Sequence, residues 1–217
     1  MRRVVRPELL DSSDAPQHEV RVSLIDLQRI NRWFGGVSTT KYMIRRALSR
    51  SLNTTVSILD VGAATGDGPR KVQEAFPQVR FTLLDRDRSH FDGTRQLMSC
   101  VAGDALTLPF AAKSFDFVTC SLFAHHLEPA ELAAFVREGL RASRVAVLIN
   151  DLCRSYLHLA AVHAGKPLFR WITRHDSVAS VRRSYTPNEM MGILNGFGRG
   201  FELHRTYLFR MGVIIWK

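Results

Sequence analysis

Residues 56–68 constrain the fold more than any other part of the chain. An apolar run, residues 56–61, ends in a glycine-rich turn containing Gly62 and Gly66, and an amphipathic helical pattern follows from Asp67. Glycine allows a tight turn and a close approach of backbone to ligand. The first N–H groups of a helix attract negative charge. The stretch therefore predicts a parallel strand that carries a ligand to the start of a helix.

Further strand patterns alternate with helical patterns along the chain. The last two strands are joined too tightly for a crossover, so we expect them to pair antiparallel. The remaining alternation predicts a doubly wound α/β fold, with a mostly parallel sheet and helices on both faces. Ligands of such sheets bind beyond the carboxyl ends of the strands. The expected strands after the first are 79–84, 100–103, 115–121, 144–149, 201–207 and 209–216, and the expected helices of this region are 68–76, 89–98, 128–140, 152–164 and 187–195.

The first 55 residues form a separate N-terminal helical extension or lid in this interpretation. Residues 1–17 contain many turn formers and predict an extended, partly mobile lead-in. An amphipathic helix follows over 18–34, with its apolar positions at Val20, Leu24, Leu27, Ile30 and Phe34, and Ser38–Thr40 is expected to cap a second helix. These helices either cover an apolar face or act as a lid through Asn31, Arg32, Trp33 or Tyr42.

Polar side chains follow the expected strands where a nucleoside would bind. Asp85 ends the second strand at roughly the 20-residue offset at which an acidic residue binds ribose hydroxyls. A carboxylate suits a cis-diol because its two oxygens can accept both O–H bonds. After the third strand, Asp104 could accept a hydrogen bond from an adenine amino group, and the N–H of Ala105 could donate to a ring nitrogen. The alternative is that Asp85 only caps the helix that follows.

Two cofactors fit such a turn, a nicotinamide dinucleotide and S-adenosylmethionine. Gly62, Gly66 and Gly68 match a dehydrogenase turn, but 55 residues precede the first strand here, and such enzymes usually begin at that strand. They also use a Tyr-x-x-x-Lys pair, and none of the four tyrosines has a lysine four positions later. S-adenosylmethionine is therefore the better prediction.

The chain resembles the class I S-adenosylmethionine-dependent methyltransferases over residues 56–216, most closely the small-molecule branch of ubiquinone and menaquinone biosynthesis. Five motifs in order carry the resemblance: residues 59–66, Asp85, 103–110, 115–118 and 121–127. It implies a Rossmann-like sheet of seven strands with an antiparallel last strand. The pattern often has glycine where this chain has Ala64, and alanine is tolerable there if its φ is negative. The implied cofactor-binding residues are Asp60, Gly62, Ala63, Ala64, Gly66, Asp85, Arg86, Asp104, Ala105, Ser121 and Leu122.

The implied reaction is methyl transfer to an acceptor, and an oxygen or carbon acceptor must also lose a proton. His125 and His126 follow the fourth strand, beside the expected methyl group, and either could act as the base. One of them could instead cap the next helix. Asp151 and His175 are reserve candidates, the latter within the segment 152–186, which we expect to be less regular and to form a substrate wall. No metal site is predicted, because Cys100, Cys120 and Cys153 are too scattered.

Composition restricts the partners only weakly. Scattered thiols, the absence of an apolar membrane span and a start without a secretory signal predict a cytoplasmic protein. The formal net charge of +10 could attract nucleic acid or an anionic substrate. The loop after the fourth strand lacks the Asn/Asp-Pro-Pro-aromatic motif of base methylation. We therefore favour a small, aromatic or quinone-like acceptor, with an RNA or protein methyltransferase and a non-catalytic cofactor-binding protein as alternatives.

Overall fold

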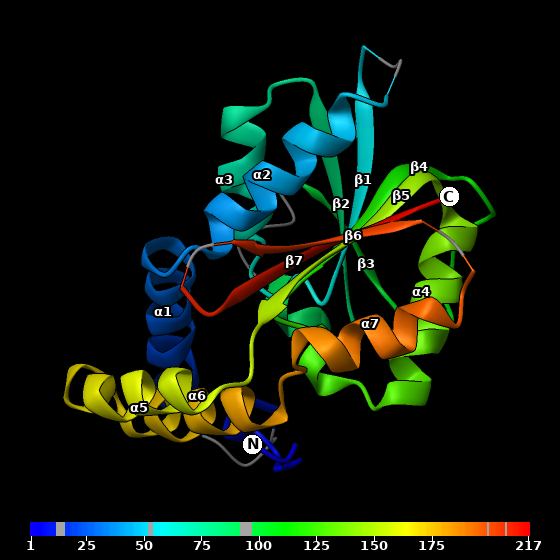
Figure 1. Ribbon diagram of the computed structural model, residues 1–217. Coiled ribbons are helices and arrows are strands. Elements are labelled where there is room, and N and C mark those ends of the chain that lie inside the picture. The colour runs from blue at the N-terminus through cyan, green and yellow to red at the C-terminus, as the bar shows by residue number, and fades with distance from the viewer. Residues whose placement is uncertain (12–15, 52–53, 92–96, 199, 207) are drawn as a thin grey trace.

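One sheet of seven strands organises the computed structural model (Figure 1). The structure describes residues 1–11, 16–51, 54–91, 97–198, 200–206 and 208–217. The strand order is β3-β2-β1-β4-β5-β7-β6. The strands are β1 (Val56–Val61), β2 (Val79–Asp85), β3 (Ser99–Ala102), β4 (Phe115–Ser121), β5 (Ser143–Leu152), β6 (Phe201–Thr206) and β7 (Arg210–Trp216).

The pairing confirms the predicted sheet. All pairs among β1 to β5 are parallel, whereas β7 runs antiparallel to both β5 and β6. The strand β5 is longer than expected, because Asn150 and Asp151 pair with Gly212 and Met211 of β7 instead of forming a loop. The side chains of Asn150 and Asp151 are therefore fixed by the sheet.

Helices cover both faces of the sheet (Figure 1). On one face, α2 packs against β5 and β7 and α3 packs against β2; on the other, α4 packs against β4 and β5, and α7 contacts α4 and β6. The α-helices are α1 (Gln17–Trp33), α2 (Gly36–Leu48), α3 (Asp67–Ala75), α4 (Pro129–Ala142), α5 (Tyr156–Gly165), α6 (Trp171–Arg183) and α7 (Pro187–Asn195), and the short 3-10 helices are η1 (Leu9–Asp11), η2 (Arg88–Phe91), η3 (Ala124–His126) and η4 (Lys166–Leu168).

Alternation along each central strand builds two separate cores. Ile58 and Leu148 belong to the core under α2 and α3, whereas Leu59 and Ile149 belong to the core under α4 and α7. All four side chains are fully buried. Since successive strand residues point to opposite faces, a continuous apolar run fills both cores, as a doubly covered parallel sheet requires.

Two local predictions were wrong, and a third falls partly outside the described residues. Helix α2 starts at Gly36 behind Gly35, which has φ +80, and Ser38 and Thr40 lie inside its first turns with their hydroxyls bonded to Gly35 O and Gly36 O. The irregular region expected after Trp171 is the regular helix α6. Of the helix expected over 89–98, the structure has the short η2, and residues 92–96 lie outside the described residues.

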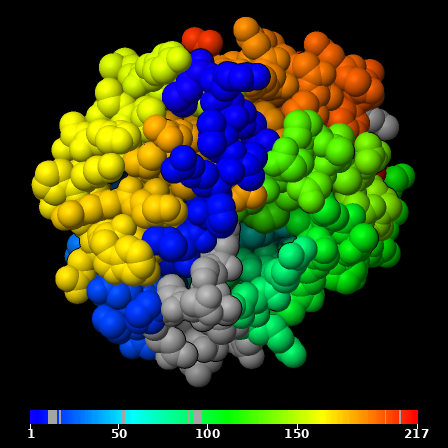
Figure 2. Space-filling view, turned by 90° about the horizontal axis from the view of Figure 1, so that it is seen from below, coloured from blue at the N-terminus to red at the C-terminus, as the bar shows by residue number. Residues whose placement is uncertain are grey.

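The N-terminal segment, residues 1–11, is docked on the protein rather than loose, contrary to the expected mobile lead-in. Arg3 donates to Arg183 O at 2.7 Å and to Leu127 O at 3.0 Å, and its guanidinium lies 4.6 Å from the centre of the Tyr185 ring. Asp176 of α6 accepts the N–H groups of Leu9 and Leu10 at 2.8 and 3.0 Å. In Figure 2 the blue N-terminal segment lies between the yellow segments of α5 and α6 and the green region.

We expect Asp176→Asn to release this docked segment locally. Asparagine keeps one acceptor oxygen but turns an NH2 donor toward one of the two backbone N–H groups. A lost hydrogen bond to a charged group is worth about 1.5 kcal/mol, so the amides of Leu9 and Leu10 should exchange with deuterium about tenfold faster. Asp67→Asn, in the first turn of α3 and away from the docked segment, is the matched control. Unchanged exchange at both amides in Asp176→Asn would contradict this account of the docking.

No helix in the described ranges has both the length and the apolar character to cross a membrane. Cys100, Cys120 and Cys153 form no disulfide bonds with one another.

Candidate active site

A cavity of about 1200 Å³ lies beyond the carboxyl ends of the parallel strands. Its floor includes Gly62 after β1, Asp85 at the end of β2 and Leu122 after β4. Its other walls come from the docked N-terminal segment, α1, α5, η4 and α6. The parallel sheet therefore brings the sequence-predicted strand ends together in one cavity.

The turn after β1 has the strained backbone expected of a ligand-binding loop. Gly62 and Gly66 have φ of +68 and +67. A Cβ on Gly62 would lie 2.5 Å from Cδ2 of Phe123, so only glycine fits there. Ala64 has φ +43, so the condition under which alanine was expected to be tolerable, a negative φ, is not met. Its N–H donates to Asp85 Oδ2 at 2.9 Å, which holds the strained turn against β2.

Asp85 lines the cavity as an ionised acceptor. Its carboxylate accepts from Ala64 N at 2.9 Å, Asp87 N at 3.1 Å and His90 Nδ1 at 3.2 Å. Burial raises the pKa of Asp85, but the hydrogen bonds from His90, Ala64 and Asp87 outweigh burial and hold the pKa below its usual value. Two carboxylate oxygens offer about four acceptor sites, and the described residues use three of them.

Asp104 follows β3 on the same wall. Its Oδ1 accepts from Leu106 N at 2.9 Å, and its Oδ2 pairs with Arg86 Nη2 at 3.0 Å. The Leu106 N–H and the Arg86 guanidinium together hold the pKa of Asp104 below its usual value. Ala105 and Arg86 also line the cavity, although Arg86 is mostly exposed.

The loop after β4 has a second strained residue. Leu122 has φ +56, unusual for a branched side chain, and its N–H donates to Asn150 O at 2.8 Å. Ser121, beside it, bonds Thr40 of α2 at 3.2 Å. Among the described non-glycine residues with positive φ, Ala64, Leu122 and Phe209 line the cavity, so backbone strain concentrates there.

Four of the predicted cofactor residues do not line the cavity: Asp60, Ala63, Gly66 and Ser121. They lie in or behind the turns that shape it. Asp60 is buried within β1 and accepts the Thr119 hydroxyl at 2.7 Å. Burial raises the pKa of Asp60 to about 7, against the hydrogen bond from Thr119 and with help from the nearby Asp85 charge.

The Asp60 carboxyl should make stability fall as the pH rises. Its folded pKa of about 7 exceeds the unfolded value of 3.8, so the folded state keeps a proton that the unfolded state loses between about pH 4 and 7. One pKa unit corresponds to about 1.4 kcal/mol, which bounds the loss at roughly 4 kcal/mol. Asp60→Asn should therefore stabilise the ligand-free protein more at pH 8 than at pH 5, measured by urea unfolding. A gain equal at both pH values would contradict this assignment.

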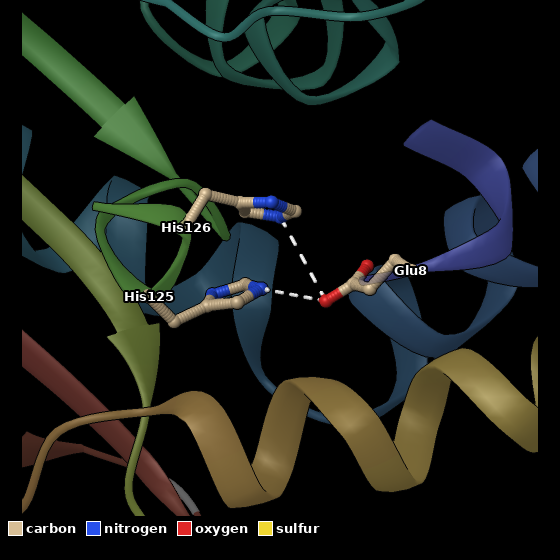
Figure 3. A group of neighbouring side chains, drawn as sticks. All are labelled: Glu8, His125 and His126. Atoms are coloured by element: carbon tan, nitrogen blue, oxygen red, sulfur yellow. Dashed lines mark ion pairs between the residues drawn. The ribbon is translucent and has the colours of Figure 1, made fainter. Parts of the chain in front are cut away.

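His125 and Asp151 form a buried pair below the cavity wall. His125 Nδ1 donates to Asp151 Oδ1 at 2.7 Å, and His125 N donates to Asp151 Oδ2 at 2.8 Å. His125 Nε2 lies 3.4 Å from Glu8 Oε1 of the docked N-terminal segment (Figure 3). Burial lowers the pKa of His125, but the two carboxylates outweigh burial and raise the pKa to about 10. Burial likewise raises the Glu8 pKa, and the histidines lower it to about 2.

His126 lies beside His125 and faces the same carboxylate (Figure 3). Its Nε2 is 3.8 Å from Glu8 Oε1, and its ring is 22% exposed. Arg183 of α6 bonds the carbonyl of His126 at 2.5 Å and lies 3.4 Å from its Nδ1. Both histidines line the cavity, whereas Asp151 lies behind His125.

His175 is not part of this group. It projects from α6, is nearly half exposed, and pairs with Asp176 at 2.8 Å rather than lining the cavity. The structure therefore joins His125, His126 and Asp151 and leaves the fourth predicted catalytic residue apart.

The sequence did not indicate two parts of this site. Glu8 lies in a segment without periodicity, so no local pattern marks it. Helix α1 lines the cavity through its apolar stripe, not through the residues proposed for a lid. The stripe residues that line the cavity are Val20, Leu24, Leu27, Ile30 and Phe34. An apolar stripe predicts a buried helix face, and sequence alone does not distinguish a core from a ligand cavity.

Comparison with known proteins agrees with the fold. Residues 58–145 match a family described as a methyltransferase domain. The plantazolicin methyltransferase BpumL, in complex with a monoazolic desmethylPZN analog and SAH, has a TM-score of 0.70 at 14% identity over 93% of this chain and 91% of its own. A SAM-dependent methyltransferase from Aquifex aeolicus has a TM-score of 0.58 at 16% identity, covering 79% of this chain and 88% of its own.

A third solved structure, an O-methyltransferase family 2 protein from Planctomyces limnophilus in complex with apigenin, has a TM-score of 0.64 at 18% identity over 94% of this chain and 63% of its own. No curated protein sequence matched this chain. The chain thus has the Rossmann-like fold of these methyltransferases.

Proposed function

We propose that this protein is an S-adenosylmethionine-dependent methyltransferase that acts on a small organic acceptor. The observation that carries the proposal is the single cavity that joins the strand-end carboxylates Asp85 and Asp104 to the His125–His126 pair. The methyltransferase-domain match over residues 58–145 and the fold shared with a methyltransferase solved with SAH support it.

The strand-end residues fit an adenosyl cofactor. Asp85 is ionised, and a ribose diol would donate two hydrogen bonds to it. One would use the fourth acceptor site of the carboxylate, and the other would displace the longest present bond, that of His90 at 3.2 Å. Asp104 and the N–H of Ala105 would bond the adenine edge. Gly62, Ala64 and Leu122 line the cavity where the methionine end would lie. Asp60, Ala63, Gly66 and Ser121 would support this loop from behind, with Arg86 at the rim.

The other end of the cavity suits an apolar acceptor that carries a polar group. The stripe of α1 provides the apolar wall, and His125 and His126 provide the polar end. When bound, the cofactor would supply an electrophilic methyl group on sulfur, so the protein mainly needs to align the acceptor and exclude water. Residues of 152–186 and of the docked N-terminal segment line this end, and the cavity volume of about 1200 Å³ accommodates a small molecule.

The acceptor is an aromatic or quinone-like molecule methylated on oxygen or carbon in this proposal. Two solved structures with the same fold were determined with a monoazolic desmethylPZN analog and with apigenin, and these organic ligands support a small-molecule acceptor. His126 would contact the acceptor atom that loses its proton. His125, whose two ring nitrogens face Asp151 and Glu8 and whose pKa is raised to about 10, would keep its proton and hold Glu8 in place.

Asp85→Asn should weaken S-adenosylmethionine binding by about 100-fold, because the amide replaces an ionised acceptor with a group that also donates. Isothermal titration measures the affinity. Asp67→Asn, in the first turn of α3 and not among the residues that line the cavity, should bind as the unaltered protein does. Equal affinities in the two variants would overturn the ribose assignment.

Incubation with methyl-labelled S-adenosylmethionine and a panel of phenols, quinols and short RNAs tests the reaction. We expect label in a phenol or quinol, and a turnover at least tenfold lower in His126→Asn with cofactor affinity unchanged. Label in RNA alone would instead favour the nucleic-acid alternative. Cofactor binding without product on any panel member would favour a non-catalytic protein.

A further inference from the structure

Three potential metal ligands converge on one point of the cavity wall (Figure 3). Glu8 Oε1, His125 Nε2 and His126 Nε2 all lie within 4.8 Å of one another. Glu8 Oε1 is 3.4 Å from His125 Nε2 and 3.8 Å from His126 Nε2. The carboxylate arrives from the docked N-terminal segment, and the two imidazoles come from the loop after β4. The group therefore exists only because these two distant segments meet.

The group needs a positive charge at its centre. Asp151 accepts from His125 Nδ1 at 2.7 Å, so Nδ1 carries a proton. In the ion-free protein a second proton, on His125 Nε2, faces the Glu8 carboxylate, and a metal ion would take the place of that proton. His126 Nε2 points to the same oxygen. Two acceptors facing each other at 3.4 Å repel unless a cation lies between them. Either a proton on the imidazole or a metal ion can provide that charge.

We propose that Glu8, His125 and His126 bind one divalent transition-metal ion, with Zn²⁺ fitting the donor set best, and leave its fourth position open to the cavity. Two imidazoles and one carboxylate are the ligand set of several catalytic zinc sites. Tetrahedral zinc, with bonds of roughly 2.0–2.2 Å, places its ligands about 3.4 Å apart. The Glu8–His125 separation already has this value, and the Glu8–His126 separation needs a shift of a few tenths of an ångström. The separation of the two Nε2 atoms, which lies within 4.8 Å, must also settle at this value when the ion binds.

The surrounding contacts resemble the outer shell of a metal site. Asp151 orients His125 through Nδ1, and the Ser180 hydroxyl donates to Glu8 Oε1 at 2.7 Å. Such partners fix the tautomer and orientation of metal ligands. Arg183 does not fit this pattern, because its Nη1 lies 3.4 Å from His126 Nδ1. A metal ion on His126 Nε2 leaves the proton on Nδ1, so two donors would face each other and Arg183 would have to move away.

Charge balance indicates what occupies the open position. Glu8, Asp151 and Asp176 contribute three negative charges, and Arg183, Arg210 and the ion contribute four positive ones. An oxyanion in the fourth position would neutralise the excess. This part rests on the proposed function, because it places the acceptor oxygen on the ion and favours a phenol or enol as the acceptor class over a carbon acceptor without such an oxygen.

Titration of the metal-free protein with Co²⁺ and with Zn²⁺ tests the site without any turnover. We expect one ion per chain and the visible absorption of tetrahedral Co²⁺, which added Zn²⁺ should remove. Glu8→Gln and His126→Asn should each weaken binding at least 100-fold. His163→Asn, an exposed histidine of α5 outside the cavity, is the matched control and should bind as tightly as the unaltered protein.

Two results would overturn the metal proposal. One is no binding of either ion by the folded protein. The other is binding that survives both Glu8→Gln and His126→Asn, which would assign the ion elsewhere. In either case methyl transfer to the acceptor panel by the metal-free protein would leave the proposed function intact. Stoichiometric metal binding without methyl transfer on any panel would support the site and count against the proposed function instead.

Discussion

The shared direction of β1, β2, β4 and β5 is the constraint on which the rest of the structure depends. Parallel pairing brings the residues that follow each strand to one edge of the sheet. Asp85 thereby meets the turn after β1, and the loop after β4 meets Asn150 of β5. The strand ends are tied together by these bonds even without a ligand. A preformed site of this kind needs little reorganisation when a cofactor binds.

Backbone strain is concentrated where the strands end. Gly62, Ala64 and Leu122 all have positive φ, and the latter two are each fixed by a hydrogen bond from their own N–H to a neighbouring strand. Such conformations cost of order 1–3 kcal/mol each and persist only where the surroundings impose them. The fully covered sheet, with a core on each face, supplies the stability that offsets this cost.

The buried group around His125 connects three segments that are far apart in the sequence. Asp151 lies within β5, His125 follows β4, and Glu8 comes from the docked N-terminal segment. A single buried carboxylate or imidazole would be unfavourable alone. Together they favour the docking of residues 1–11, so closure of the cavity and the electrostatics of its polar end are one property of the fold.

The sequence by itself determined the order of strands and helices, the antiparallel last strand and the strand-end carboxylates Asp85 and Asp104. Apolar runs, glycine turns and polar strand ends are local signals that can be read from the sequence. Because parallel strands end at the same edge of a sheet, these signals also predict that the strand-end residues lie together. Only the tertiary structure decided that Glu8 faces His125 and His126, that the stripe of α1 lines a cavity, and that His175 stays apart. These outcomes depend on contacts between segments far apart in the chain. Neither residue spacing nor composition predicts which distant segment packs against a given residue.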